Sequence, residues 1–169
     1  LLNHYKTITS PLLRPLVDMQ LNGVNVDIEF KDRAVEECEL KMAYIMKLLD
    51  MALPKKINTS KTYEHKFNPN SPKDKKFLFY DVFKCRKVYH QGTLTTKSSA
   101  LKEFIKKAKN DYIVFFAELC IGHKEASYLA SRLKTDLLNG RMHTQYDSSG
   151  TVTERLNSKE SILEGGKGT

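Results

Sequence analysis

The sequence lacks three features that would place it in well-defined classes of protein. It has no run of about 18 apolar residues, so we predict no transmembrane helix. Its three cysteines, Cys38, Cys85 and Cys120, lie far apart without a C-x-x-C motif, which indicates a reduced, intracellular compartment rather than a disulfide framework. Its five histidines have no H-E-x-x-H or other ligand spacing, and we therefore predict no structural metal.

The first residues also lack a secretory signal and an initiating methionine, so we expect the chain to be cut from a longer protein. Its 169 residues are 40% hydrophobic and 28% charged, with a mean hydropathy of −0.47. These values predict a soluble chain of one domain, or of one domain plus a fragment of another.

The net charge of +8 is concentrated in the middle of the chain. Residues 54–110 carry 15 basic and 4 acidic side chains, while the segments on either side are slightly acidic. Lysine and arginine displace the counterions condensed on nucleic acid, so this distribution favours a polyanionic partner for the middle third. The alternative is a surface whose charge only keeps the protein soluble.

Apolar residues recur at three- and four-residue steps in most of the chain, which is typical of amphipathic helices. We predict a first helix with Ser10 as its N-cap and Pro11 at its first position, ending at about Gln20, and a long helix over 28–53 that Asp27 caps. Further helices are predicted where Ser71 is the cap and Pro72 the first residue, and where Thr96 or Ser98 caps a short helix. Asp111 is expected to cap the last long helix, which runs to about Leu138. Segments 55–66 and 84–95 are polar, aperiodic and predicted to be loops.

For two of these helices, the sequence predicts which residues face inward. Phe77, Leu78, Asp81 and Val82 set the period of the helix that begins at Pro72, and Tyr128 belongs to the inner stripe of the last helix. The last helix is expected to end at a C-cap pair, Asn139-Gly140. The two long helices can then lie antiparallel, with the basic region at one tip.

A hairpin is predicted over residues 139–158, because Asp147-Ser148-Ser149-Gly150 has turn chemistry between two alternating segments. Met142, Thr144 and Tyr146 would share one face of its first strand, and Val152 and Leu156 the inner face of the second. The fold class is therefore mainly α: an antiparallel helical bundle over 1–138 with a basic tip at about 54–110, a C-terminal β-hairpin over 139–160, and a flexible tail over 161–169.

The hairpin carries the motif Gly140-Arg141-x-His143-Thr144, followed by T-x-T-x-R-L-x-S over residues 151–158. This order resembles the segment that enters the palm of A-family DNA polymerases, the relatives of bacterial DNA polymerase I. Earlier segments are similar to the family's thumb in the correct order: residues 15–27, the F-N-P-N-S-P-K run over 67–73, residues 95–101, and Glu118-Leu119 with Ala126-Ser127-Tyr128. The resemblance covers about residues 10–160.

The resemblance implies a thumb subdomain with the first strands of a palm, gripping primer–template duplex without reading its sequence. Phosphates would be met by hydroxyl, amide and lysine groups at two helix starts, although Ser71 and Thr96 can equally be plain N-caps. In the hairpin, Arg155 matches the arginine that reaches the minor groove. The implied DNA-binding residues are Asn68, Asn70, Ser71, Lys73, Lys76, Thr96, Lys97, Ser98, Ser99, Lys124, Arg141, His143, Thr153, Arg155, Asn157 and Ser158.

The chain departs from the family pattern at three places. Gln20 replaces the usual glutamate, Glu154 stands where the family has glycine before its arginine, and the match ends after Glu160. The carboxylates that hold two Mg²⁺ ions in the family belong to later motifs, so no catalytic residue or cofactor is assigned here, although Mg²⁺ is expected for the longer parent. We therefore predict that this chain alone does not polymerise DNA.

The implied partners are duplex DNA and the remaining palm and fingers of the polymerase, in the cytoplasm, in a host cytoplasm for a phage protein, or in an organelle. Two other functions remain open. One is a free-standing helical module that stacks single-stranded RNA on aromatic residues of the basic region, namely Tyr63, Phe67, Phe79, Tyr80 and Tyr89. The other is a bundle whose outer helical faces bind protein.

Overall fold

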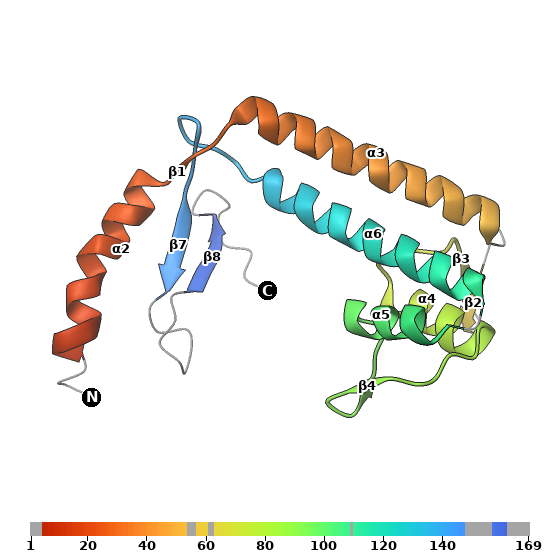
Figure 1. Cartoon of the computed structure of the whole chain (residues 1–169). Helices are drawn as coiled ribbons and strands as arrows, with labels where there is room; N and C mark the ends of the chain where they lie inside the picture. Colours follow the sequence, from red (N-terminus) through yellow and green to blue (C-terminus); the bar gives the residue numbers. More distant parts are fainter. Residues whose placement is uncertain (1–4, 54–56, 61–62, 109, 148–156, 162–169) are drawn as a thin grey trace. The chain divides into compact units, whose positions relative to one another are not determined.

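The computed structural model describes residues 5–53, 57–60, 63–108, 110–147 and 157–161. The fold is mainly helical, with short antiparallel strand pairs, as predicted (Figure 1). Among the described residues, no helix is long and apolar enough to cross a membrane. The chain forms two compact units, one from residues 1–34 and 131–169 and the other from residues 35–130. The long helices α3, Ile28–Ala52, and α6, Asp111–Leu133, contribute to both.

The first unit begins with a π-helical turn, η1 (Tyr5–Thr9), that leads into α2 (Ser10–Asn22). Pro11 lies in the first turn, where its missing N–H costs no intrahelical hydrogen bond. Gly23 ends α2 with a positive φ of 59°, and its N–H donates to the Met19 carbonyl at 3.0 Å. The Asp27 side chain then accepts from the Phe30 N–H at 2.9 Å, which confirms it as the cap of α3.

The described residues of this unit also form four short strands, which make two separate antiparallel pairs instead of one hairpin. β1 (Val24–Asn25) pairs antiparallel with β6 (Arg141–Met142), while β7 (Thr144–Asp147) pairs with β8 (Asn157–Ser161). Met142 and Tyr146 therefore belong to different strand pairs rather than to one face of a single strand. The predicted return strand around residues 151–156 lies outside the described residues; the described partner of β7 begins at Asn157.

The last long helix ends earlier than predicted, at Leu133 instead of Leu138. Asn139 and Gly140, with φ of 52° and 73°, do not cap it. They form a tight two-residue turn in which the N–H groups and carbonyls of Leu138 and Arg141 exchange hydrogen bonds at 2.9 and 3.0 Å. An Asn-Gly pair suits both a helix end and such a turn, because both require positive φ.

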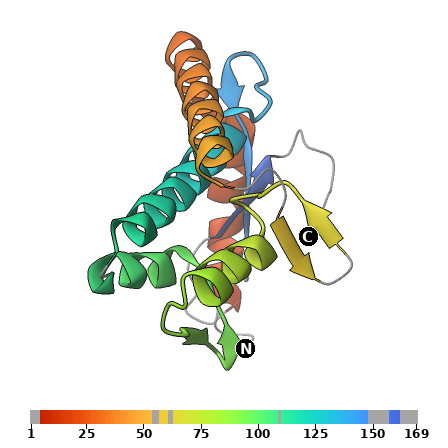
Figure 2. The same cartoon turned by 90° about the vertical axis from the view of Figure 1, so that its right-hand side faces the viewer.

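In the second unit, α3 and α6 run antiparallel side by side (Figures 1 and 2). Cys38 packs against Ala126 and Ala130, while Ile45, two turns further along α3, lies against Gly122. These three small residues of α6 recur at four-residue steps and let the two helices approach closely. Tyr128 was predicted to face inward, but it is 62% exposed, because the small residues of α6 form the contact with α3.

A second layer packs against these helices through α4 (Pro72–Lys76), a π-helical segment η2 (Phe77–Val82) and α5 (Ser98–Lys107). Phe79 is fully buried and stacks on Phe104 with ring centroids 5.4 Å apart. The predicted period was wrong here: η2 buries three consecutive side chains, Leu78, Phe79 and Tyr80, and exposes Val82. A π-helix is wider than an α-helix, so the spacing of inward residues changes.

Both basic segments predicted to be loops contain hairpins. β2 (Ile57–Ser60) pairs with β3 (Tyr63–His65), and β4 (Tyr89–His90) pairs with β5 (Thr93–Leu94). Between β4 and β5, Gln91 and Gly92 have φ of 50° and 74°, the conformation of a tight hairpin turn. Two-residue strands leave too little alternation in the sequence to distinguish them from a loop.

Three helix starts also differ from prediction. The N-cap position of α5 is Lys97, so neither Thr96 nor Ser98 caps it. Asp111 is the first residue of α6 rather than its cap; the Asn110 side chain accepts from the Tyr112 N–H at 2.9 Å instead. At α2 the cap position is Thr9, which makes no side-chain capping bond, and Ser10 is already helical.

Candidate nucleic-acid interface

A basic hollow of about 430 Å³ opens in the second unit between the starts of α4 and α5. Its described lining contains four lysines and no carboxylate: Lys75 and Lys76 from α4, Lys97 from the cap of α5, and Lys124 from α6. Asn70 and Thr95 add polar groups from the two loops that precede the helices. The fold thus brings together residues predicted from separate motifs.

The start of α5 offers the stronger anion site of the two helix starts. Lys97 at its N-cap makes no side-chain capping bond, so the cap side chain does not occupy the first N–H groups of the helix. Lys124 reaches this end from α6, with its Nζ donating to Ser98 Oγ at 3.4 Å. Unpartnered N–H groups, the positive end of the helix dipole and an ammonium group together favour a phosphate there.

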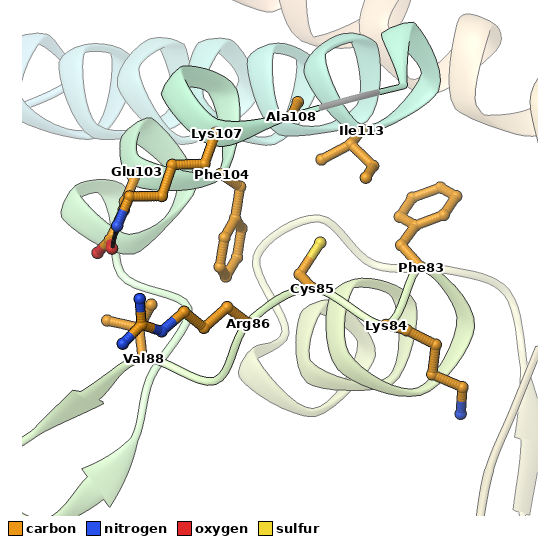
Figure 3. Close-up of a pocket in the computed structure, with 10 residues that line it drawn as sticks. All are labelled: Phe83, Lys84, Cys85, Arg86, Val88, Glu103, Phe104, Lys107, Ala108 and Ile113. Atoms are coloured by element: carbon orange, nitrogen blue, oxygen red, sulfur yellow. Dashed lines mark hydrogen bonds and ion pairs between the residues drawn. The ribbon is translucent and has the colours of Figure 1, made fainter.

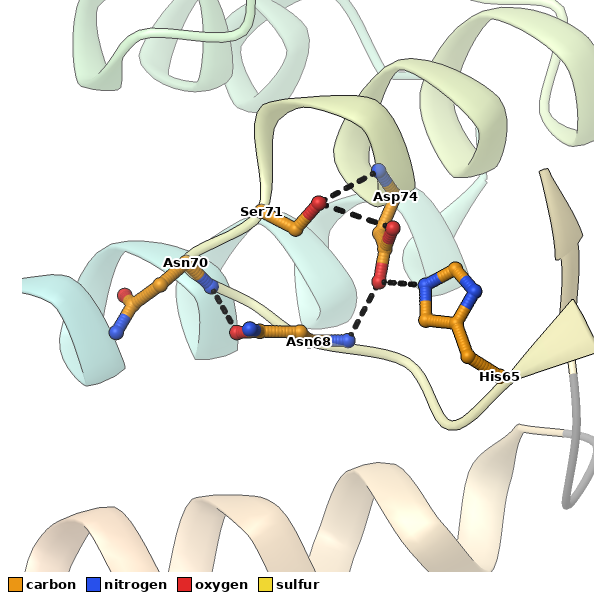
Figure 4. Close-up of polar contacts among 5 residues, drawn as sticks. All are labelled: His65, Asn68, Asn70, Ser71 and Asp74. Carbon is orange, nitrogen blue, oxygen red and sulfur yellow. Dashed lines mark hydrogen bonds and ion pairs between the residues drawn. The ribbon is translucent and has the colours of Figure 1, made fainter. Parts of the chain in front are cut away.

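The start of α4 is already occupied by its own side chains (Figure 4). Ser71 Oγ accepts from the Asp74 N–H at 3.3 Å and donates to Asp74 Oδ1 at 3.0 Å. The other carboxylate oxygen of Asp74 accepts from the Asn68 N–H at 2.8 Å and lies 2.7 Å from His65 Nε2. The capping role predicted for Ser71 is confirmed, and the carboxylate satisfies this helix start internally.

Asp74 is the residue that sequence reasoning missed at this site. It is only 1% exposed and holds the 65–71 loop in place, including the turn in which Asn68 Oδ1 accepts from the Asn70 N–H at 2.9 Å. The spacing of Ser71 and Asp74 is a capping box with aspartate in place of glutamate, so the sequence contained a signal for this contact. No such signal exists in the sequence for the contact of His65 with Asp74, because His65 belongs to strand β3, which was not predicted.

Positive charge is crowded around the inner wall of the hollow. Burial lowers the pKa of Lys75, which is 7% exposed, and the nearby charge of Lys124 lowers this pKa further. Burial and the charge of Lys75 likewise lower the pKa of His123, whose Nδ1 lies 3.3 Å from Asn70 Oδ1. A bound anion would relieve this repulsion. Neither Lys75 nor His123 was predicted as a site residue, since only the packing of α6 against α4 brings them together.

The remaining predicted residues of the second unit have varied surroundings. Lys73 is exposed but does not line the hollow, whereas Lys76 does. Thr96 lines it although the residue is only 4% exposed. Ser99 is exposed at the first turn of α5, next to Ser98.

In the first unit, the structure gives Arg141 and His143 internal partners. Arg141 donates through Nε to the Asn22 carbonyl at 2.5 Å and through Nη2 to the Gly23 carbonyl at 3.3 Å. His143 is 8% exposed, and its Nδ1 donates to the Gln20 carbonyl at 2.9 Å. Both side chains thus fasten β6 and β7 to the end of α2.

The two motifs that carry the family resemblance meet at Gly23. A Cβ atom at this position would lie 2.7 Å from the Met142 carbonyl oxygen and 2.9 Å from the His143 ring. Gln20, which stands in place of the family's glutamate, donates from its side chain to the Tyr146 carbonyl at 3.4 Å. The glycine of the first motif and the histidine of the second are therefore packing partners, although 120 positions separate them in sequence.

Part of the predicted site lies outside the described residues, namely Thr153 and Arg155, together with the departure at Glu154. Asn157 and Ser158 belong to β8, where their backbones pair with Asp147 and Tyr146. Within the described part of the chain, no group of three or more His, Cys, Asp or Glu side chains is arranged to hold a metal ion.

Comparison with known proteins gives a match in structure but not in sequence. Neither a protein-family model nor a curated protein matches the chain. Among solved structures, it is similar to the POL domain of Pol1 from M. smegmatis in complex with DNA primer-template and dNTP, with a TM-score of 0.74 and 20% sequence identity. The match covers 94% of this chain and 26% of that one, so this chain spans about a quarter of its structural neighbour. The resemblance drawn from the motifs is thereby confirmed in the fold: the chain folds like a segment of an A-family DNA polymerase domain.

Proposed function

We propose that this chain is part of a DNA-directed DNA polymerase and grips primer–template duplex as a thumb joined to the first strands of a palm. The observation that carries the proposal is the basic hollow, in which four lysines meet the uncapped start of α5. Such an arrangement binds phosphates regardless of base sequence, which is what a polymerase requires of a duplex grip. The structural neighbour, itself in complex with primer-template, supports this function.

The first unit has a supporting role in this proposal. Arg141 and His143 fix β6 and β7 against α2, and so set where the segment that follows β7 leaves the fold. We propose that Arg155 contacts the minor groove from that segment, and that Arg141 and His143 contribute by this positioning. Direct contact of Arg141 and His143 with DNA stays a prediction; Arg141 is exposed in the structure.

Nucleotidyl transfer is proposed for the longer polymerase and not for this chain alone. Such polymerases use two Mg²⁺ ions to stabilise the attacking and leaving oxygens. The described residues provide no cluster that fits these ions, and we assign no step of the reaction to them.

The packing of the aromatic residues favours duplex DNA over single-stranded RNA. Phe67, Phe79 and Tyr80 are at most 6% exposed and belong to the core, so they are not available for stacking on bases. Of the predicted stacking residues whose side chains the structure describes, Tyr89 is exposed at 60%, and one ring does not form a stacking platform. The side chain of Tyr63 lies outside the described part of the chain.

A binding experiment separates the two functions. Fluorescence anisotropy would measure the affinity of the chain for a labelled primer–template duplex and for a single-stranded RNA of equal length. We expect tighter binding to the duplex, similar affinity within about twofold for duplexes of unrelated sequence, and a steep loss of affinity between about 50 and 200 mM salt. Preference for the RNA, or duplex affinity that is flat over this salt range, would contradict the proposal.

A further inference from the structure

A second pocket lies in the same unit but on a different set of elements. It has a volume of about 220 Å³ and is bordered by the segment 83–88, the second half of α5 and the first turn of α6 (Figure 3). Its apolar lining residues include Phe83, Cys85, Phe104 and Ile113. It shares no lining residue with the basic hollow, so the proposed grip on DNA does not account for it.

The walls of this pocket are formed in advance by the hydrophobic core. Phe104 is buried and stacks on Phe79, while the Phe83 ring lies 5.6 Å from that of Phe116. The Cys85 N–H donates to the Phe79 carbonyl at 2.8 Å, which fixes the chain where it leaves η2. A ligand would therefore not need to order these groups when it binds, and this lowers the entropic cost of binding.

The rim of the pocket is positively charged. Arg86 and Lys107 line it together with one carboxylate, Glu103, while the ammonium group of Lys84, a further lining residue, points away from the other lining side chains (Figure 3). Lys107 Nζ donates a hydrogen bond to Glu103 Oε1 at 2.5 Å. This hydrogen bond is the main cause of the lowered pKa of Glu103, and the charge of Arg86 makes a smaller contribution. The apolar cavity is thus bordered by more positive than negative charge, with Arg86 extending toward the Glu103–Lys107 pair (Figure 3).

We propose that this pocket binds one aromatic or large aliphatic side chain of an acidic peptide segment in a partner protein. The volume accommodates about one such side chain, whose burial contributes roughly 1.5–3 kcal/mol. This is too little for a stable complex, so carboxylates beside the anchor must pair with the rim cations. The cation-rich rim selects acidic sequences, and the apolar cavity excludes acidic chains that lack an anchor.

Peptides of matched composition test the proposal on the full chain. The probe is a fluorescein-labelled peptide with one phenylalanine between runs of aspartate. Replacing its phenylalanine by alanine, or its aspartates by asparagines, should each weaken binding about tenfold or more. If the alanine peptide binds as tightly as the parent, the site is only a basic patch and the proposal is overturned.

Variants of the protein give a second, independent readout. Ala108→Leu fills the pocket, and Arg86→Glu reverses a rim charge without touching the core; each should weaken the peptide about tenfold. Lys47→Glu, an exposed residue of α3, is the charge-matched control and should change peptide affinity less than about twofold. Unchanged peptide affinity in the Arg86→Glu variant would overturn the proposal even if Ala108→Leu fails to fold.

Alkylation of Cys85, which lines the pocket, measures directly whether the pocket is occupied. Cys38 and Cys120 are buried, whereas Cys85 is half-buried. Burial raises the pKa of the Cys85 thiol and raises that of Cys120 to about 12, so exposure makes Cys85 the thiol that iodoacetamide should reach first. Mass spectrometry would follow its modification at about pH 8.5. The phenylalanine peptide should slow this reaction about fivefold or more at saturation, and the alanine peptide should not. Equal rates with and without saturating phenylalanine peptide would contradict binding in this pocket, whatever the outcome of the DNA experiment.

Discussion

Replacement of Asp74 by alanine should destabilise the second unit strongly. The carboxylate is 1% exposed and lies within hydrogen-bonding distance of three groups, the Ser71 hydroxyl, the Asn68 N–H and His65 Nε2, at 2.7 to 3.0 Å. Each buried donor left without an acceptor costs about 1–3 kcal/mol. Because water can reach the partly exposed partners, we expect a total loss of roughly 3–5 kcal/mol rather than the upper sum.

Urea denaturation followed by far-UV circular dichroism measures this loss. With an m-value of about 2 kcal/mol/M, a loss of this size lowers the midpoint by about 1.5–2.5 M. Asp74→Asn keeps the volume and one acceptor oxygen, and should cost about half as much. Asp81→Ala, at an exposed position of η2, is the control and should stay within about 0.5 kcal/mol of the parent. A loss below about 1 kcal/mol for Asp74→Ala would show that the Asp74 carboxylate does not stabilise the 65–71 loop in this way.

Two further predictions concern other parts of the chain. Gly23→Ala should lower the free energy of unfolding by about 2 kcal/mol or more, because φ is 59° and the new methyl group would lie 2.7 Å from the Met142 carbonyl; a urea midpoint unchanged from the parent would contradict this. Since burial lowers the pKa of His123, the unfolded chain binds more protons than the folded chain between the folded and unfolded pKa values. Stability should therefore rise with pH across this range, and His123→Gln should flatten the rise; an identical pH profile in that variant would refute the assignment.

Local chemistry made part of the fold predictable from the sequence. Ser71 and Pro72 mark a helix start because a hydroxyl cap and a residue without an N–H both suit that position, and the structure confirms them. Asp27 caps α3 for the same reason. Of the four lysines that meet in the hollow, the family resemblance had implied Lys76, Lys97 and Lys124 but not Lys75.

Tertiary packing determined the features that could not be predicted. Lys75 lines the hollow, and His123 lies against Asn70 of the same lining, because α6 packs near α4; a single sequence gives no measure of the distance between these elements. The inward residues of η2 follow a π-helical spacing, which only the packed core selects. Arginine and histidine are residue types that often bind phosphates. In the structure, however, the side chains of Arg141 and His143 donate hydrogen bonds to backbone carbonyls at the end of α2, about 120 positions away in the sequence.

The proposed grip on DNA requires that the lysines at the start of α5 hold DNA phosphates. The most direct test is the slope of log affinity against log salt for primer–template duplex, compared between the parent chain and a variant carrying Lys97→Gln and Lys124→Gln. Each lost phosphate contact reduces the magnitude of this slope by about 0.9, so we expect the loss of two contacts to reduce it by about 1.8. Lys41→Gln with Lys47→Gln, at exposed positions of α3, removes the same charge and should leave the slope nearly unchanged. An equal reduction in both variants, or none in the first, would contradict the claim.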